Sequence, residues 1–283
     1  MIAPPSATPP FATRQTGRRR LAAPVVAALA VALVVLGAIG ARAANPNALW
    51  EIVHGQCVPD QQRHDDPAPC ARVALPGGVA RGYAVLKDRV GATQFLLIPT
   101  ARVSGIESPE LLAPDAPNYF AAAWQARTYV DSRAHRTLPR ESVSLAINSM
   151  FARSQDQLHI HIDCIRADVR DALRAHLAQI GERWAPLDVP LAGRRYRAIR
   201  VLGEALGQAN PFKLLADGVP GAREDMGGHT LVVTGAVFAN GEPGFIVLDG
   251  HADPAAGDRG FGEALQDHAC ALAQSGSPEG SSR

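Results

Sequence analysis

The first 43 residues contain no aspartate or glutamate, although five arginines lie among them. Without these five, the chain's 28 basic residues fall to 23 against 27 acidic ones, so the net charge of +1 hides a mildly acidic remainder. A general nucleic-acid binder needs a concentrated basic stripe in its folded part, and none follows residue 43. We therefore expect no nucleic-acid partner.

Residues 21–41 lack charged side chains altogether and are almost wholly apolar. Their number matches the ~20 residues that cross a bilayer as a helix. Three consecutive arginines at 18–20 precede them, so the positive-inside rule places the N-terminus in the cytoplasm and the bulk of the chain in the periplasm. A cleaved signal peptide is the alternative, because residues 41–43 resemble a cleavage site, but the run exceeds the usual ~7–15 apolar residues.

This reading divides the chain into four parts. Residues 1–20 are rich in Pro, Ala, Thr and Arg and should be a disordered cytoplasmic segment. Residues 21–41 form a single transmembrane helix or an uncleaved signal anchor in the bacterial inner membrane, 45–273 an exported domain, and 274–283 a flexible tail. With 47% hydrophobic residues, the exported part is large enough to bury one sizeable core or two small ones.

The sequence also lacks a C-x-x-C pair, which makes a zinc site unattractive for its cysteines. Its four cysteines, an even number, all follow the apolar segment, as expected of a chain that is oxidised after export. Three pairings are open, and four buried thiols are the alternative. We favour Cys57 with Cys70, which closes a short Pro-rich loop, and Cys164 with Cys270.

The exported part predicts alternating hairpins and helices. Branched and aromatic residues predict strands, and apolar residues at helical spacing predict helices. The fold class that follows is α+β, a largely antiparallel sheet with packed helices, preceded by the transmembrane helix. The expected strands are 82–87, 94–99, 142–148, 157–164, 196–201, 230–238 and 244–248, and the expected helices are 49–53, 119–135, 168–180 and 262–273, with a polar loop at 59–69.

No fixed-period repeat is visible in this pattern. Beyond Trp184 the signals are weaker, and Gly and Pro interrupt them. A degenerate second copy of the first unit remains an open hypothesis for this half.

Residues 157–163 carry the clearest chemical signal. Strand side chains alternate between faces, so Gln157, His159, His161 and Asp163 should share one face while the leucine and isoleucines between them enter the core. Two imidazoles placed in this way bind a metal, pair a nucleophile with a phosphate-orienting partner, or occupy a solvated face.

The nucleophile interpretation is favoured by the surroundings. A zinc site needs a third protein ligand, and no H-x-x-x-H or Glu-x-x-His companion occurs. The preceding strand end and loop supply Asn148, Ser154 and Gln155, neutral groups that hold a phosphate without protonating an imidazole. A neutral histidine nitrogen attacks phosphorus near neutral pH and gives a labile phosphoramidate.

An H-x-H strand after an Asn-ended strand and a Ser/Gln loop resembles the histidine-triad superfamily of nucleotide hydrolases and transferases. More narrowly, residues 49–270 resemble the bacterial CDP-diacylglycerol pyrophosphatases, which are membrane-anchored, exported enzymes. The H-x-H alone is weak evidence, but the collinear set is specific. It comprises 82–88, 96–100 (Leu-Leu-Ile-Pro-Thr), 105–109 (Gly-Ile-Glu-Ser-Pro), 124–127 (Trp-Gln-Ala-Arg), 144–149 (Ser-Leu-Ala-Ile-Asn-Ser) and 159–166 (His-Ile-His-Ile-Asp-Cys-Ile-Arg).

The resemblance implies roles for the two histidines. His159 matches the middle histidine, the nucleophile that accepts the nucleotidyl group, and His161 matches the third, which contacts the phosphates. Asn148 and Ser154 match polar groups near the phosphate, and Gln155 matches more loosely. Gln157 stands where the triad has its first histidine but retains a backbone carbonyl to orient His159, so we expect it to tune activity. A register with His161 as nucleophile and Asp163 third is the alternative.

The implied function is hydrolysis of CDP-diacylglycerol to CMP and phosphatidate in phospholipid metabolism, through a nucleotidyl-histidine intermediate and with no metal or other cofactor. The alternatives are a zinc-dependent hydrolase and a tethered module that binds nucleotide or lipid without turnover. For Arg153 and Lys87 the sequence favours two interpretations equally: contact with the pyrophosphate, or solvation at the surface. Oligomeric state is not predicted. The remaining histidines lack local partners in the sequence and are predicted to be surface residues: His54, His64, His135, His176, His229, His251 and His268.

Overall fold

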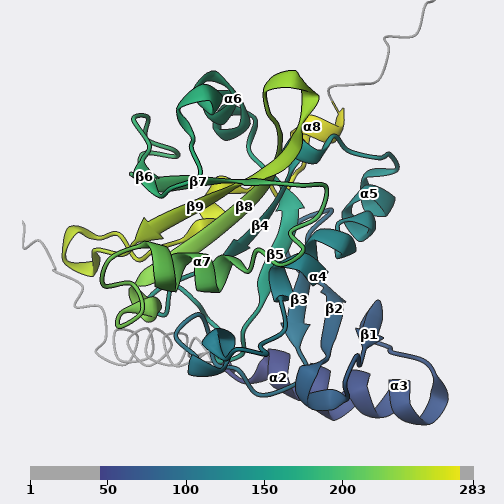
Figure 1. Cartoon of the computed structure of the whole chain (residues 1–283). Coiled ribbons are helices and arrows are strands. Elements are labelled where there is room, and N and C mark those ends of the chain that lie inside the picture. The colour runs from purple at the N-terminus through teal and green to yellow at the C-terminus, as the bar shows by residue number, and fades with distance from the viewer. Residues whose placement is uncertain (1–44, 275–283) are drawn as a thin grey trace, which may run out of the picture. The chain divides into compact units, whose positions relative to one another are not determined.

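Nine strands within residues 45–274, the part of the chain that this computed structural model describes, form one sheet (Figure 1). Every neighbouring pair is antiparallel, in the order β1-β2-β3-β5-β4-β8-β9-β7-β6. The strands are β1 (Arg72–Ala74), β2 (Tyr83–Lys87), β3 (Phe95–Pro99), β4 (Val143–Ile147), β5 (Ile160–Cys164), β6 (Ala185–Pro186), β7 (Arg197–Leu202), β8 (His229–Val237) and β9 (Pro243–His251).

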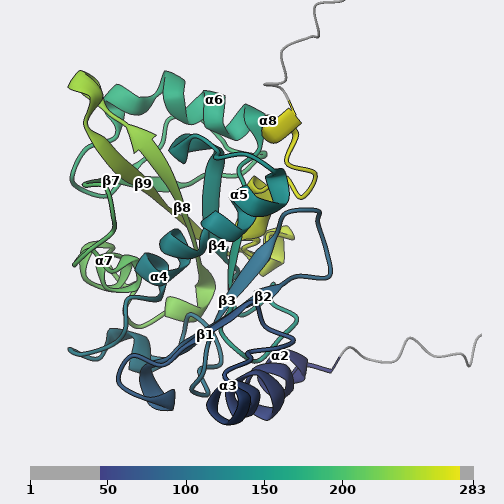
Figure 2. The same cartoon turned by 90° about the vertical axis from the view of Figure 1, so that its right-hand side faces the viewer.

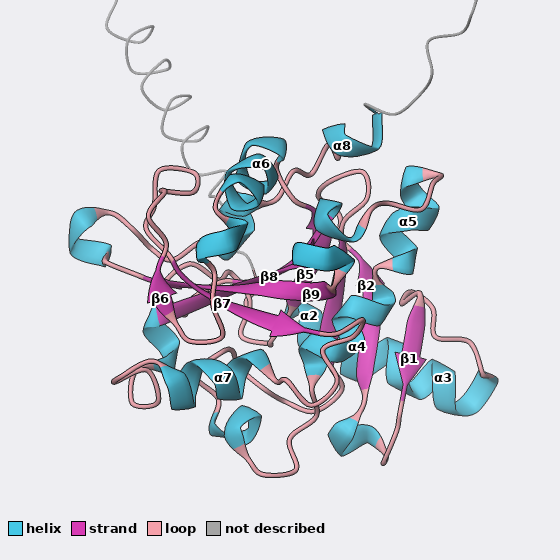
Figure 3. Cartoon of the chain, turned by 45° about the horizontal axis from the view of Figure 1, so that its top comes forward, coloured by secondary structure: helices cyan, strands magenta, loops and turns pink. Residues whose placement is uncertain are grey.

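Short helices cover both faces of this sheet (Figure 3). The α-helices are α2 (Ala48–Ile52), α3 (Val58–His64), α4 (Tyr119–Ala126), α5 (Thr128–Ala134), α6 (Ala167–Ala175), α7 (Pro211–Gly218) and α8 (Ala271–Gln274), and a π-helical turn, η1 (Val53–Cys57), joins α2 to α3.

The described part is thus α+β with an antiparallel sheet, but the fold prediction is wrong in its transmembrane helix. The longest α-helix in residues 45–274, α6, has nine residues. Nine residues rise only about 14 Å, whereas a bilayer core is ~30 Å thick. No helix in this part of the chain is long and apolar enough to cross a membrane. Residues 1–20, 21–41 and 275–283 of the predicted division lie outside the described residues.

The two halves of the sheet repeat one topology. In the first half the chain forms β2 and β3, then α4 and α5, then β4 and β5, in the spatial order β2-β3-β5-β4. In the second half it forms β6 and β7, then α7, then β8 and β9, in the order β6-β7-β9-β8. The third strand of each half, β4 and β8, pairs at the centre. This repeat supports the hypothesis of a second copy, which no sequence period revealed.

One face of the sheet is covered by helices from both halves. Phe120 and Trp124 of α4 and Phe212 of α7 belong to the same buried cluster as Leu145 and Phe245 of the sheet. The ring of Trp124 meets that of Phe245 edge-on, with centroids 4.9 Å apart. This contact joins a helix of the first half to a strand of the second.

The opposite face has two separate apolar clusters. One packs Val169 and Leu173 of α6 against residues of β4, β8 and β9, and the other packs α2, η1 and α3 against β2 and β3. Figure 2 shows α6 at one end of the molecule and α2 with α3 at the other. The cross-strand partners of His161 are Ala146, in the first cluster, and Leu96, in the second. The predicted catalytic strand therefore reaches this face between them.

Both favoured disulfides are present. Cys57 bonds Cys70, and Cys164 at the end of β5 bonds Cys270 ahead of α8. The second bond ties the central strand to the final described segment.

Several predicted elements differ from the structure, and for one of them the cause is tertiary contact that overrides the local pattern. The predicted helix 262–273 is a 3-10 turn (Gly262–Leu265), an extended stretch and α8, because Gln266 pairs with Ile165 and Asp267 N–H donates to the Cys164 carbonyl. The helix 119–135 is divided into α4 and α5 at Arg127. Residues 59–64 of the predicted loop at 59–69 are helical and belong to α3.

Phe245→Ala tests the packing between the halves. It removes a fully buried ring and its contact with Trp124, so we expect the free energy of unfolding to fall by about 3–5 kcal/mol in denaturant titrations. Leu202→Ala, at a 43% exposed position, is the control and should change it by less than about 1 kcal/mol. A loss below 1 kcal/mol for Phe245→Ala contradicts this account of the core.

Candidate active site

The two histidines of the H-x-H motif lie side by side on one face of the sheet. Their rings are 4.9 Å apart between centroids and inclined by 67°. The residues between and beside them, Leu158, Ile160 and Ile162, enter the core on the other face, as the alternation predicts. His159 and His161 are themselves only 8% and 5% exposed. Burial of this kind excludes a merely solvated sheet face.

His159 is oriented by a backbone group. Its Nδ1 lies 2.7 Å from the carbonyl oxygen of Gln157, and since a carbonyl only accepts, Nδ1 carries the proton and donates. Nε2 then keeps its lone pair, and no hydrogen bond within residues 45–274 engages it. Burial lowers the pKa of His159 and outweighs the opposing effect of the Gln157 hydrogen bond, so the imidazole is neutral at pH 7.

A polar side chain lies near each ring nitrogen of His161. Its Nδ1 lies 2.6 Å from the amide nitrogen of Gln94, which donates, and its Nε2 lies 3.4 Å from a carboxylate oxygen of Glu263. Burial, reinforced by neighbouring His159, lowers the pKa of His161 to about 3. The second imidazole is neutral as well.

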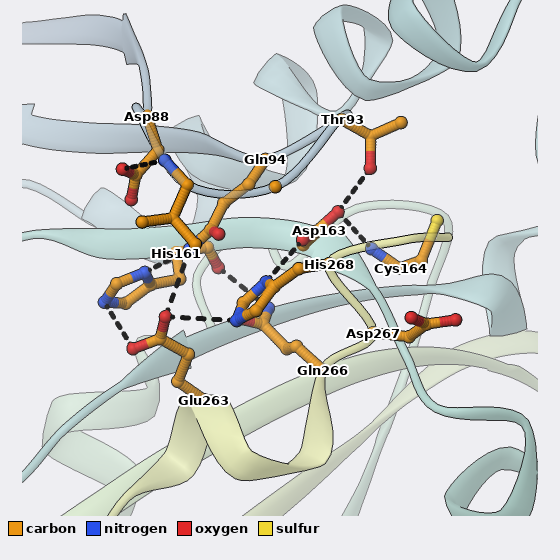
Figure 4. Close-up of polar contacts among 12 residues, drawn as sticks. Asp88, Thr93, Gln94, His161, Asp163, Cys164, Glu263, Gln266, Asp267 and His268 are labelled. Atoms are coloured by element: carbon orange, nitrogen blue, oxygen red, sulfur yellow. Dashed lines mark hydrogen bonds and ion pairs between the residues drawn. The ribbon is translucent and has the colours of Figure 1, made fainter. Parts of the chain in front are cut away.

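Glu263 gathers several donors at one carboxylate (Figure 4). Its Oε2 accepts from Asn148 Nδ2 at 3.1 Å, and its Oε1 lies 3.3 Å from Nε2 of His268 and 3.4 Å from the amide nitrogen of Gln94. Burial alone would raise the pKa of Glu263, but the hydrogen bonds, that of His268 first, lower it below its usual value. The carboxylate is therefore ionised beside His161.

His268 links Glu263 to a second carboxylate. Its Nδ1 lies 2.9 Å from Asp163, a fully buried side chain that also accepts from Thr93 Oγ1 at 2.6 Å and from the backbone N–H of Cys164. The hydrogen bonds to Asp163 and Glu263 raise the pKa of His268 to about 10. His268 is an imidazolium, and the prediction that it is an unpartnered surface residue is wrong.

Arg153 approaches the site from the loop after β4. Its guanidinium bonds Glu107 at 2.6 Å, and Arg153, Asn148 and His159 line one small cavity of about 10 Å³, room for about one water molecule. A side chain at Gly105 would collide with Arg153 and Glu107, so glycine permits this approach. Lys87, in contrast, donates to the carbonyls of Asp88 and Gly91 and closes the β2–β3 turn.

The four predicted substrate-binding residues are placed differently from one another. Asn148 is brought to the histidines through Glu263. Gln157 contributes its backbone carbonyl, while its amide donates to the carbonyls of Pro99 and Ala101. Gln155 bonds the start of α2 by accepting from Leu49 N–H and donating to the Asn45 carbonyl, and Ser154 is exposed and makes no side-chain hydrogen bond to the two histidines. The structure thus brings Asn148 and Gln157 to the site.

A second imidazole–carboxylate cluster lies at the same end of the sheet. Nδ1 of His229 lies 2.7 Å from fully buried Asp249, which also accepts from Arg197, and Nε2 of His251 bonds Asp225 at 2.8 Å. The His229 side chain is only 5% exposed, so its prediction as a surface residue is wrong too. Throughout residues 45–274, no three His, Cys, Asp or Glu side chains are arranged to hold a metal ion. This part of the chain therefore offers no set of ligands for the alternative of a zinc-dependent hydrolase.

The raised pKa of His268 predicts a pH-dependent stability. The folded state holds this proton up to about pH 10, while an unfolded histidine loses it near ~6.5. The stabilising contribution is therefore complete below about pH 6.5 and is lost as the pH rises toward 10. Urea titrations at pH 6, 8 and 10 should show this loss, and His268→Gln should show a smaller one. Equal slopes in both proteins would contradict the assignment.

Comparison with known proteins identifies relatives over nearly the whole described part. The family model described as CDP-diacylglycerol pyrophosphatase matches residues 44–274. A curated protein of Yersinia pestis, named CDP-diacylglycerol pyrophosphatase, is 46% identical over 229 residues, which cover 81% of this chain and 86% of that relative.

Proposed function

The chain belongs to the CDP-diacylglycerol pyrophosphatase family and hydrolyses the diphosphate bond of CDP-diacylglycerol in phospholipid metabolism, and we propose that it does so through a covalent cytidylyl intermediate on His159. The observation that supports this proposal is the single hydrogen bond from His159 Nδ1 to the Gln157 carbonyl. It leaves Nε2 of a buried, neutral imidazole available as a nucleophile. The family membership also removes the alternative of a binding module without turnover.

In the first step, the lone pair of His159 Nε2 attacks the phosphorus attached to cytidine. The bond from that phosphorus to the bridging oxygen breaks, and its electron pair leaves with phosphatidate. The Nε2–P bond forms, so the imidazole carries both a cytidylyl group and the Nδ1 proton, and the Gln157 carbonyl accepts from this more acidic N–H. Phosphatidate leaves as an anion and needs no proton.

In the second step, water attacks the same phosphorus. The Nε2–P bond breaks, its electron pair returns to Nε2, and one proton of the water passes to solvent. CMP is released and His159 is neutral again. We assign to His161 the role of the third triad histidine, which contacts the phosphates. Its ring adjoins that of His159, and Asn148 and Arg153 flank the same place.

The transferring phosphoryl group develops negative charge, which nearby N–H donors stabilise. Asn148 and Arg153 are the donors best placed beside His159, since all three line one cavity. Gln157 stands in the first triad position and supports the reaction through its backbone carbonyl, which orients His159. The assignments of Ser154 and Gln155 to substrate binding remain predictions, since their contacts are to the loop and to the start of α2.

We also propose that the catalytic part works in the periplasm. Two disulfides within residues 45–274 support an oxidising compartment, because such bonds are rare in bacterial cytosol. Cells expressing the full chain are quenched with acid and treated with a maleimide polymer, with and without prior reduction. All four thiols should label only after reduction, and labelling of four thiols in unreduced samples would overturn the proposal.

The intermediate is tested by trapping. Full-length protein is mixed with CDP-diacylglycerol labelled at the cytidine-linked phosphate and quenched in alkali, because phosphoramidates hydrolyse in acid. Label should appear on the wild type and on His64→Ala, an exposed control, and disappear with His159→Ala. His161→Ala should still accept label, at least about tenfold more slowly. Label that survives His159→Ala but not His161→Ala would move the nucleophile to His161.

The lowered pKa of His159 predicts the acid side of the pH–rate profile. Only the neutral imidazole attacks, and burial keeps it neutral below the usual pKa of 6.5. The profile of kcat/KM, which reports the free enzyme, should therefore stay level down to pH 6.5 and fall only below it. A decline that begins above pH 7 would contradict a buried, neutral nucleophile.

A further inference from the structure

We propose that Glu263 is a positioning residue for cytidylyl transfer, whose carboxylate, held by His268 and Asp163, aligns His161 and Asn148 and keeps a negative charge facing His159. This inference rests on the proposed role of His159 as nucleophile. Glu263 lies in a 3-10 turn that follows the second half of the sheet, far in sequence from the H-x-H motif.

The contacts of Glu263 account for the alignment. Donors from three segments converge on its carboxylate: Asn148 from the end of β4, Gln94 from the residue before β3, and His268 from the turn before α8. Nε2 of His161 in β5 lies 3.4 Å from the same carboxylate. Glu263 and Asn148 also bond reciprocally, since the Glu263 backbone N–H donates to Asn148 Oδ1 at 3.2 Å. A single side chain thus fixes both groups that we assign to the phosphates.

The turn that carries Glu263 is tightly held. A side chain at Gly262 would collide with Thr230 and with the Ile147 carbonyl, so the backbone there lies directly on the sheet. Leu265 is fully buried, and the amide of Gln266 donates to the carbonyls of Ser144 and His161. These contacts leave the carboxylate little freedom to move away from His161.

The Asp163–His268–Glu263 network carries one net negative charge. Asp163 and Glu263 are anionic and His268 is cationic, so the imidazolium balances one carboxylate only. His159 is neutral before the reaction and gains positive charge as its Nε2 bonds phosphorus. A fixed carboxylate nearby stabilises that charge in a poorly hydrated site.

Burial is the largest influence on the pKa of His159, followed by the Gln157 hydrogen bond, and charged neighbours act beside them. Glu263 of the 3-10 turn and Asp88 of the β2–β3 turn raise its pKa, Arg153 of the loop after β4 lowers it, and His161 of β5 is neutral. Removing the negative charge of Glu263 therefore lowers the pKa of His159 further. A shift of the acid limb of the pH–rate profile is therefore a readout that a purely structural role of Glu263 would not produce.

The test compares Glu263→Gln with wild type in the full chain. Glutamine keeps the shape and an acceptor for Asn148 but removes the charge. We expect kcat on CDP-diacylglycerol in detergent micelles to fall at least about tenfold, KM to change less than about threefold, and the acid limb of kcat/KM to move to lower pH. Glu263→Asp should restore part of kcat and the position of the limb. Glu110→Gln, at an exposed position, is the matched control and should match wild type.

The trapping experiment separates this proposal from the one on which it rests. Slower formation of cytidylyl-enzyme in Glu263→Gln than in wild type supports the role of Glu263. Equal rates of labelling, or a lower kcat with an unmoved acid limb, overturn it while leaving His159 as the nucleophile. Absence of label from wild type overturns the nucleophile assignment itself. Circular dichroism of Glu263→Gln that departs from wild type shows a structural role for Glu263 and also overturns the proposal.

Discussion

The arrangement of the candidate site depends on two imidazoles that are buried and remain uncharged. Burial disfavours the charged form of both imidazoles by more than the nearby carboxylate of Glu263 favours it, so His159 and His161 remain neutral in the sheet. The carbonyl of Gln157 then decides which nitrogen of His159 carries the proton. Because that carbonyl belongs to the backbone, a glutamine at position 157 still supplies the group that orients His159 in the proposed mechanism.

The charged groups of the site are not these imidazoles but their neighbours. Asp163, His268 and Glu263 form a chain of paired ions, each satisfied by a partner of opposite sign or by an N–H donor. Such pairing is what permits carboxylates to remain ionised in a largely buried place. In the proposed mechanism the two imidazoles that face the phosphates are neutral, and the paired ions beside them hold His161 and Asn148 in position.

Much of the local structure was predictable, because it depends on short-range pattern. The alternation around His159 and His161 gave the correct faces, and the disulfide pairs and most strands were identified. Glu263 and His268 were missed because nothing near them in sequence distinguishes them from surface residues. Their roles arise from contacts to His161 and Asp163 of β5, more than a hundred positions earlier. The predicted helix at 262–273 had the same cause of error, since tertiary pairing with β5 replaced the local pattern.

The two halves that share this topology contribute different residues to the candidate site. Only the first half carries the H-x-H strand, yet the segment after the second half supplies Glu263, His268 and Cys270 to it. During synthesis, a ribosome must therefore translate nearly the whole described chain before the catalytic strand meets its charged partners. A nascent chain that has released only its first half contains His159 and His161 but not Glu263 and His268, so the candidate site is completed only near the end of synthesis.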